Sequence, residues 1–61
     1  MLALAGLIAE LPKLERTVIM LRFFEDLDQS SIGARIGYSQ MHVSRLLRRA
    51  LARMRTQLLE P

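Results

Sequence analysis

Arginine is the residue type on which the chemistry of this sequence depends. Between residues 39 and 59 the chain carries five arginines and no acidic residue. On a helical wheel they lie opposite an apolar stripe, because the apolar residues recur every three or four positions. A guanidinium binds phosphate and the edge of guanine through paired hydrogen bonds. The segment therefore predicts a helix that lies against a polyanion; the alternative is an ordinary solvated charged face. The arginines are Arg45, Arg48, Arg49, Arg53 and Arg55.

Catalytic and metal-binding chemistry finds little support in the sequence. The serines have no base at a suitable spacing, and His42 is the only histidine. The chain has no cysteine, and a zinc site needs three or four ligands. We therefore expect no enzyme activity, no metal and no cofactor, and we assign His42 to the surface or to a phosphate contact.

Length and charge narrow the class of protein. The chain has 61 residues, which allows one domain with a small core. Its net charge of +3 divides into −2 for residues 1–28 and +5 for residues 29–61, and a basic half is typical of nucleic-acid-binding proteins. The first nine residues are too few to span a bilayer, which takes about 20 apolar residues, and they lack the basic start of a signal peptide. We expect a soluble, cytoplasmic protein.

The elements that must position the arginines are helices. Their apolar spacing predicts an all-α fold, a small bundle of four helices near residues 2–10, 13–24, 29–36 and 40–58. Pro12 suits the first turn of the second helix. Asp28 and Ser39 are good N-caps for the third and fourth helices. Gly37 suits the left-handed residue that closes a helix.

The second predicted helix carries more apolar surface than one helix face can hold. Either this helix is buried on two sides, or part of it is an exposed patch for a partner protein; both interpretations stay open here and can hold for different residues. We predict a partner-binding surface formed by Ile19, Met20 and Phe23.

The third and fourth helices fit a helix-turn-helix over residues 28–58. The motif needs a glycine in the turn, and Gly37 supplies it. It needs a small residue where the helices cross, and Gly33 lies four residues earlier. An ordinary pair of antiparallel helices is the alternative. We expect the inward-facing or turn-filling residues to be Ile32, Ile36, Tyr38, Val43 and Leu46.

These residues resemble a known family. Residues 11–24 resemble the LPxRERxVLxLRF opening of region 4 of bacterial sigma-70-family factors. Residues 27–39 are similar to its LTQxEIAxxLGVS segment, and residues 39–46 and 49–55 are similar to SQxxVSRL and RALxxLR. The string SQMHVSRL is most similar to the sigma-B and sigma-F-like branch. LuxR-type regulators, a rival helix-turn-helix class, lack the basic RALxxLR tail. A second rival is a protein-interaction bundle that binds no DNA.

The resemblance implies a function for residues 1–61 as a region 4 domain, which we expect to be a piece of a longer chain. Region 4 recognises the −35 promoter element through the second helix of its helix-turn-helix. Its other face holds the flap-tip helix of the RNA polymerase β subunit. Factors of this branch are held inactive by anti-sigma proteins. The expected partners are therefore promoter DNA, RNA polymerase and an anti-sigma factor, and the expected location is the bacterial nucleoid.

The resemblance also implies roles for individual residues. Arg45 can bind guanine, Gln40 can bind adenine, and the exposed Met41 suits a thymine methyl group. Base contacts are implied for Gln40, Met41, Ser44 and Arg45. Phosphate contacts are implied for Ser39, Arg22, Arg35, Arg48, Arg49 and Arg53. We predict a further one for His42, on the chemistry of that residue and not on the resemblance. The chain departs from the family at Leu14, where arginine is usual, and at Ser31, where glutamate would complete a capping box.

Overall fold

The computed structural model describes residues 4–59, which form four helices and, within that range, no strand. The helices are α1 (Leu4–Ala9), α2 (Lys13–Phe23), α3 (Gln29–Ile36) and α4 (Gln40–Leu59). The predicted all-α class and helix order are confirmed. The predicted start of the first helix, at residue 2, lies outside the described residues. The other boundaries agree to within one residue.

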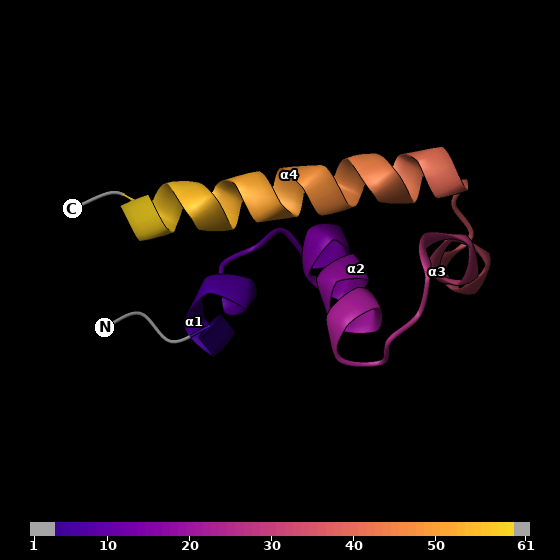
Figure 1. Cartoon of the computed structure of the whole chain (residues 1–61), viewed down its shortest axis with the longest axis horizontal. Helices are drawn as coiled ribbons and strands as arrows, with labels where there is room; N and C mark the ends of the chain where they lie inside the picture. The colour runs from indigo at the N-terminus through magenta and orange to yellow at the C-terminus, as the bar shows by residue number, and fades with distance from the viewer. Residues whose placement is uncertain (1–3, 60–61) are drawn as a thin grey trace.

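The long helix α4 organises the molecule. It has 20 residues, which at 1.5 Å per residue gives a length of about 30 Å. It contacts each of the other three helices, most extensively α2 and α3. Figure 1 shows α3 beneath the N-terminal end of α4, α2 beneath its middle and α1 beneath its C-terminal half. The described parts of α1 and α3 make no contact with each other, so α2 and α4 lie between the two ends of the domain.

The helix ends follow the signals in the sequence. The Asp28 carboxylate accepts a hydrogen bond of 2.8 Å from the Ser31 N–H, and the Ser39 hydroxyl accepts one of 3.1 Å from the His42 N–H. Gly37 closes α3 in the left-handed conformation, with φ of 81°. Pro12 is the N-cap residue of α2 and precedes its first turn, one position earlier than predicted.

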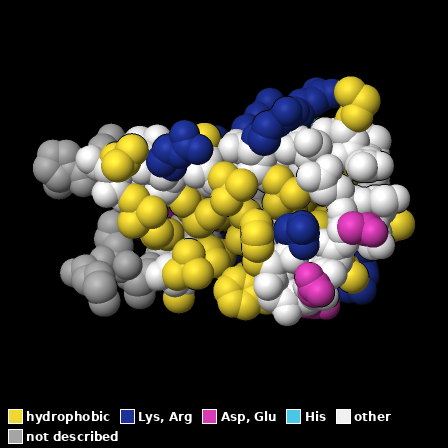
Figure 2. Space-filling model, viewed as in Figure 1, with side chains coloured by type: hydrophobic (Ala, Val, Ile, Leu, Met, Phe, Trp, Pro, Cys, Tyr) yellow, Lys and Arg dark blue, Asp and Glu magenta, His cyan; other side chains and the backbone are white. Residues whose placement is uncertain are grey.

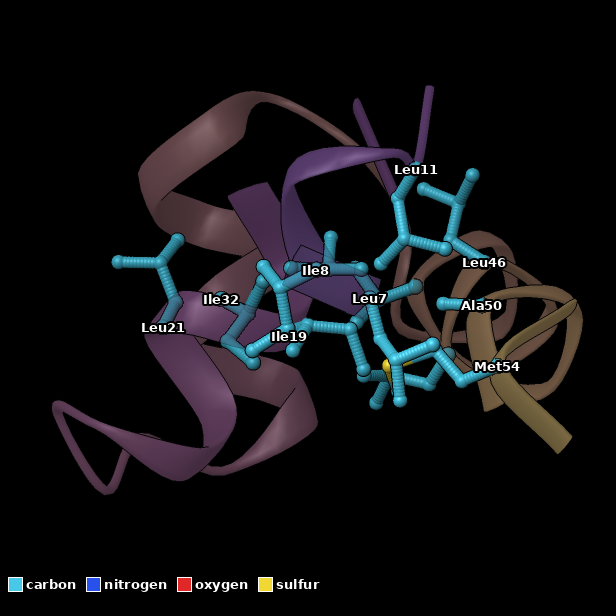
Figure 3. Close-up of a cluster of buried hydrophobic side chains, with 12 residues drawn as sticks. Leu7, Ile8, Leu11, Ile19, Leu21, Ile32, Leu46, Ala50 and Met54 are labelled. Carbon is cyan, nitrogen blue, oxygen red and sulfur yellow. The ribbon is translucent and has the colours of Figure 1, made fainter. Parts of the chain in front are cut away.

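The core is a single cluster of apolar side chains from all four helices. Figure 3 shows Ile19 and Ile32 near its centre, with Leu21 on one side and Ala50 and Met54 on the other. Val18, Ile19, Ile32 and Val43 are the most completely buried large side chains. Leu14, at the position where the family usually has arginine, packs partly buried against this cluster. That substitution therefore exchanges a surface cation for additional core contact.

The helix-turn-helix crosses at Gly33. The N–H groups of Gly37 and Tyr38 both donate to the Gly33 carbonyl, each at 2.9 Å. A Cβ atom at Gly33 would collide with the Tyr38 carbonyl oxygen, so only glycine allows the chain to turn this closely. Ile32 and Val43 are fully buried, Leu46 is buried, and Ile36 packs partly buried against the core, as predicted.

The prediction that Tyr38 fills the turn is wrong. Its side chain is 40% exposed and lies on the surface. Ile32 and Val43 are fully buried in the core, whereas Tyr38 is not part of it. The phenol ring packs against the His42 ring, with the ring centroids 4.6 Å apart.

Candidate nucleic-acid interface

The predicted base-contacting residues lie together on the first two turns of α4. Gln40, Met41 and Arg45 are exposed, and Ser44 is half-buried. Met41 is 70% exposed, so its role is not packing against a neighbouring helix. We call these four residues the reading end. The Ser39 hydroxyl caps the same turn, which fixes where α4 begins and how the reading end projects.

The arginines nearest the reading end have no acidic partner. Arg45, Arg48 and Arg49 are exposed, and none of them forms an ion pair with any residue from 4 to 59. The same holds for Arg55, further along the helix. Figure 2 shows basic side chains along the outer edge of α4. This edge is a row of unneutralised cations, which attracts a polyanion such as the DNA backbone.

Arg53 differs from these arginines because a carboxylate faces it. Its Nε lies 2.9 Å from Oε1 of Glu15, which is on α2. Glu15 is only 5% exposed, whereas the Arg53 side chain remains largely accessible. The resemblance implied a phosphate contact for Arg53, and sequence reasoning overlooked Glu15 as its partner.

Arg22 and Arg35 are also paired with acidic side chains. Arg22 lies 3.8 Å from Asp26, and Arg35 lies 3.9 Å from Glu25. These carboxylates belong to the turn between α2 and α3, where Asp26 has a φ of 57°. Both ion pairs are long and exposed, so each is weak. The turn nevertheless places negative charge where the two predicted phosphate contacts would have to meet DNA.

Hydrogen bonds lower the pKa of the Asp28 carboxyl, which lies at the end of this turn. The Ser31 N–H lowers the pKa of the Asp28 carboxyl below its ordinary value of 3.8, and the Ser31 hydroxyl lowers it further. The positive charge of Arg22 acts in the same direction. Asp28 therefore caps α3 as a carboxylate at neutral pH.

A second surface lies on the flank of α4 toward α1 and α2. It is a groove of about 230 Å³ formed entirely by apolar side chains. Figure 2 shows apolar side chains gathered on this face, between α4 and the helices beneath it. We call it the apolar groove. Its lining residues are Leu4, Ile8, Ile19, Phe23, Phe24, Leu51 and Met54.

The predicted partner-binding residues occupy different places around the apolar groove. Phe23 lines it and is 58% exposed. Ile19 also lines it but is 2% exposed, so it forms the floor and presents almost no free surface. Met20 is exposed but is not part of the lining. The second helix is therefore buried at Ile19 and exposed at Met20 and Phe23, and binding of a partner at the exposed residues stays a prediction. Sequence reasoning missed Leu51, although its position at the edge of the apolar stripe was a signal.

Other kinds of site are not formed by the described part of the chain. Residues 4–59 contain no group of three or more histidine, cysteine or acidic side chains that could hold a metal ion. None of the helices in that range is long and apolar enough to cross a membrane.

Comparison with known proteins identifies the family. The Sigma-70, region 4 family matches residues 7–56. RNA polymerase sigma factor SigF of Mycobacterium tuberculosis is 56% identical over 55 residues, which are 90% of this chain and 21% of the relative. The sigma-F factor of Kitasatospora aureofaciens is 50% identical over 50 residues, covering 82% of this chain and 17% of the relative. The sigma-B factor of Bacillus anthracis is 41% identical over 54 residues, covering 88% and 21%.

The matches also bear on the rival classes. The chain spans about a fifth of the length of these relatives. The matches do not favour the LuxR-type alternative, because the matched family is region 4 and the named relatives are sigma factors. Together with the helix-turn-helix geometry, the matches show that the chain belongs to the region 4 family of sigma-70 factors, in the SigF/SigB branch.

Proposed function

We propose that this domain recognises the −35 element of bacterial promoters with the reading end of α4 and docks on the β-flap of RNA polymerase with the apolar groove. It acts as part of a transcription initiation factor, not as an enzyme. The observation that carries the proposal is the exposed reading end followed by Arg48 and Arg49, which have no acidic partner among the described residues.

The geometry of α4 suits the major groove of DNA. That groove is about 12 Å wide and admits one α-helix, whose N-terminal residues reach the base edges. In this proposal Arg45 binds O6 and N7 of guanine, Gln40 binds adenine, and Met41 contacts a thymine methyl group. Ser44 lies between them and can bind either kind of base. The four side chains supply polar and apolar contacts, both of which direct readout uses.

Phosphate contacts follow from the unpaired cations near the reading end. Arg48 and Arg49 lie on either side of the exposed face, one turn beyond Ser44 and Arg45, where the helix leaves the floor of the groove. His42, beside Tyr38, and Ser39, at the start of the helix, lie at the first turn and are further candidates. Arg22 and Arg35 remain weaker candidates, because Asp26 and Glu25 lie beside them.

The apolar groove suits a helix from the polymerase. A groove formed only by apolar side chains receives the apolar face of an amphipathic helix. Phe23, Phe24 and Leu51 are exposed at this surface, and large apolar side chains left in water favour burial by a partner. The same surface is available to an anti-sigma factor, which would then compete with polymerase. The domain would work on the bacterial nucleoid in the cytoplasm.

Two binding experiments test the two halves of this proposal. A cognate duplex is first selected from a library with randomised −35 sequence, and its affinity is compared with that of a scrambled duplex over several salt concentrations. We expect sequence preference together with a steep loss of affinity as salt rises. Equal binding to both duplexes would contradict −35 recognition. Binding to neither would favour the protein-interaction alternative.

For the apolar groove, a β-flap-tip peptide is titrated into labelled domain and followed by NMR. We expect shifts at Phe23, Phe24 and Leu51, and loss of binding in Leu51→Asp. Shifts confined to residues 40–49 would contradict the assignment of this surface. Arg48→Ala serves as a control that leaves peptide binding unchanged.

A further inference from the structure

The flank of α4 opposite the apolar groove is joined to α1 and α2 by polar side chains. Arg53 donates to Glu15 at 2.9 Å, and the Gln57 side-chain amide donates to the Glu10 carboxylate at 2.7 Å. The Arg16 guanidinium donates to the Ala9 carbonyl at 3.2 Å, which ties α2 to the end of α1. We call Glu10, Glu15, Arg53 and Gln57 the polar seam. Three of these residues, Glu10, Arg53 and Gln57, line a hollow of about 360 Å³ together with Leu11 and Thr56.

We propose that Glu15 and Arg53 form a positioning pair, which holds the N-terminal end of α2 at a fixed place on α4, and that Arg53 is not a DNA contact. This inference rests on the proposed DNA recognition and adds to it. It assigns one of the arginines of α4 to the interior of the domain, and it gives a role to an acidic residue that DNA recognition leaves unexplained.

Burial makes Glu15 dependent on Arg53. Glu15 is 5% exposed and lies on the same side of α2 as Val18, which is fully buried. A carboxylate removed from water needs a cation or hydrogen-bond donors close to it, and Arg53 is the donor that lies within hydrogen-bonding distance. A phosphate that drew Arg53 away would leave this carboxylate buried without its partner. The cost of doing so favours the internal pair over the phosphate contact.

The position of the pair explains why its effect reaches DNA. Glu15 lies in the first turn of α2, between Lys13 and Arg16. Arg53 lies one turn beyond Arg49 on α4, on nearly the same side of the helix. The ion pair therefore fixes the spacing between the cations at the start of α2 and Arg49 on α4. One DNA duplex can meet both sets of cations only if that spacing is held.

The test compares Arg53→Ala, Glu15→Gln and the double variant on the cognate and scrambled duplexes, at a temperature where melting curves show each protein to be folded. If the pair positions α2, both single variants lose cognate affinity by about three- to tenfold, and the double variant loses no more than either one. The slope of log K against log salt changes by the same amount in all three variants, because each loses the same spacing between the α2 cations and Arg49. Gln57→Ala, which removes an exposed hydrogen bond of the same seam, is the matched control and binds like the wild type.

Other outcomes overturn the inference. If Arg53 is a phosphate contact, Glu15→Gln releases it and raises DNA affinity, while Arg53→Ala reduces the slope by about one. If the pair serves stability alone, the folded variants bind DNA as the wild type does. In both cases the wild type still prefers its cognate duplex, so the proposed function stands while this inference fails. A wild type that shows no DNA binding would overturn both.

Discussion

The two halves of α4 carry arginines of the same kind, but the surroundings of those arginines differ. In the N-terminal half Arg45, Arg48 and Arg49 have no acidic partner among the described residues. In the C-terminal half Arg53 is paired with the buried Glu15, whereas Arg55 has no acidic partner among those residues. A count of arginines treats all of them as candidates for DNA. The structure shows that the acidic side chains of the facing helix decide which of these arginines are available to DNA.

The helices beneath α4 differ in the same way. The N-terminal half rests on α3, which is held by the backbone turn at Gly33 and by the buried Ile32 and Val43. The C-terminal half rests on α1 and on α2, which present the apolar groove on one flank and the polar seam on the other. Under the proposed function, DNA recognition and partner binding use different lengths of the same helix. Variants at the reading end should leave peptide binding intact, and variants of the apolar groove should leave DNA binding intact. Arg53→Ala is the exception, because it weakens DNA binding through the position of α2.

The largest expected effect comes from closing the space between α3 and α4. Gly33→Ala places a Cβ against the Tyr38 carbonyl, which is backbone and cannot swing aside. We expect a loss of stability of about 1–3 kcal/mol or more, the usual cost of overpacking. DNA binding should weaken with it, because α3 no longer supports the reading end. Chemical denaturation and duplex binding measure the two effects.

Gly6→Ala is the matched control for that variant. A Cβ at Gly6, which lies within α1, meets nothing within 4 Å. Alanine is favoured over glycine inside a helix, so we expect a gain of about 0.5–1 kcal/mol. If both variants lost the same stability, the crossing at Gly33 would not be the tight contact that the turn geometry indicates.

The next effect tests the reading end itself. Arg45→Ala should cost about 1–3 kcal/mol on the cognate duplex and much less on a scrambled one, because a bidentate contact to guanine carries sequence information. Binding of the β-flap-tip peptide should not change, since Arg45 lies outside the apolar groove. Equal losses on both duplexes with a shallower salt slope would make Arg45 a phosphate contact and leave readout to Gln40 and Met41.

These expectations show what the sequence could predict. The helix-turn-helix was predictable because its requirements are local: Gly33 and Gly37 are four residues apart, and the backbone bonds at the turn join neighbouring residues. Asp28 and Ser39 were recognised as caps for the same reason. The error at Tyr38 shows the limit of that reasoning, because whether a turn residue enters the core depends on how completely its neighbours fill it.

The interaction between Glu15 and Arg53 could not be predicted from local sequence patterns. The two residues are separated by 38 positions, and their meeting depends on how α2 packs on α4. The sequence did contain a signal, since Glu15 lies four residues after Leu11 and three before Val18, both of them buried. An acidic residue at a buried position of a helix calls for a cation elsewhere in the chain. The position of Glu15 in the first turn also suits the helix dipole. The dipole explains an acidic residue there without a cation partner, so the sequence alone did not point to Arg53.

A smaller effect distinguishes a phosphate contact from a base contact. Arg49→Ala should weaken binding to cognate and scrambled duplexes equally and reduce the magnitude of the salt slope by about one. Lys13→Ala, on the part of α2 held by the positioning pair, gives a second measure of backbone contact. A loss for Arg49→Ala that is confined to the cognate duplex would move Arg49 to the reading end.

The smallest effect concerns the cap of α3, which supports the N-terminal half of α4. The hydrogen bond from the Ser31 N–H lowers the pKa of Asp28 from 3.8, so the folded protein binds this proton less tightly than the unfolded chain does. The contribution of the carboxylate to stability is therefore complete above the unfolded pKa and is lost as the pH falls through the lower, folded pKa. We expect thermal melting of the wild type to show this loss in acid.

Asp28→Asn separates this cap from the other acidic residues, because asparagine caps a helix nearly as well and does not titrate. The Asn variant should melt close to the wild type at neutral pH. As the pH falls below the ordinary aspartate pKa of 3.8, the wild type should lose the advantage of its charged cap, while the variant keeps its uncharged cap. The remaining carboxylates are common to both proteins, so the difference between the two melting temperatures isolates Asp28. A difference that stays constant from neutral pH into this acidic range would mean that the Asp28 charge contributes nothing to the cap, and that α3 is held in place by Gly33 and its buried neighbours alone.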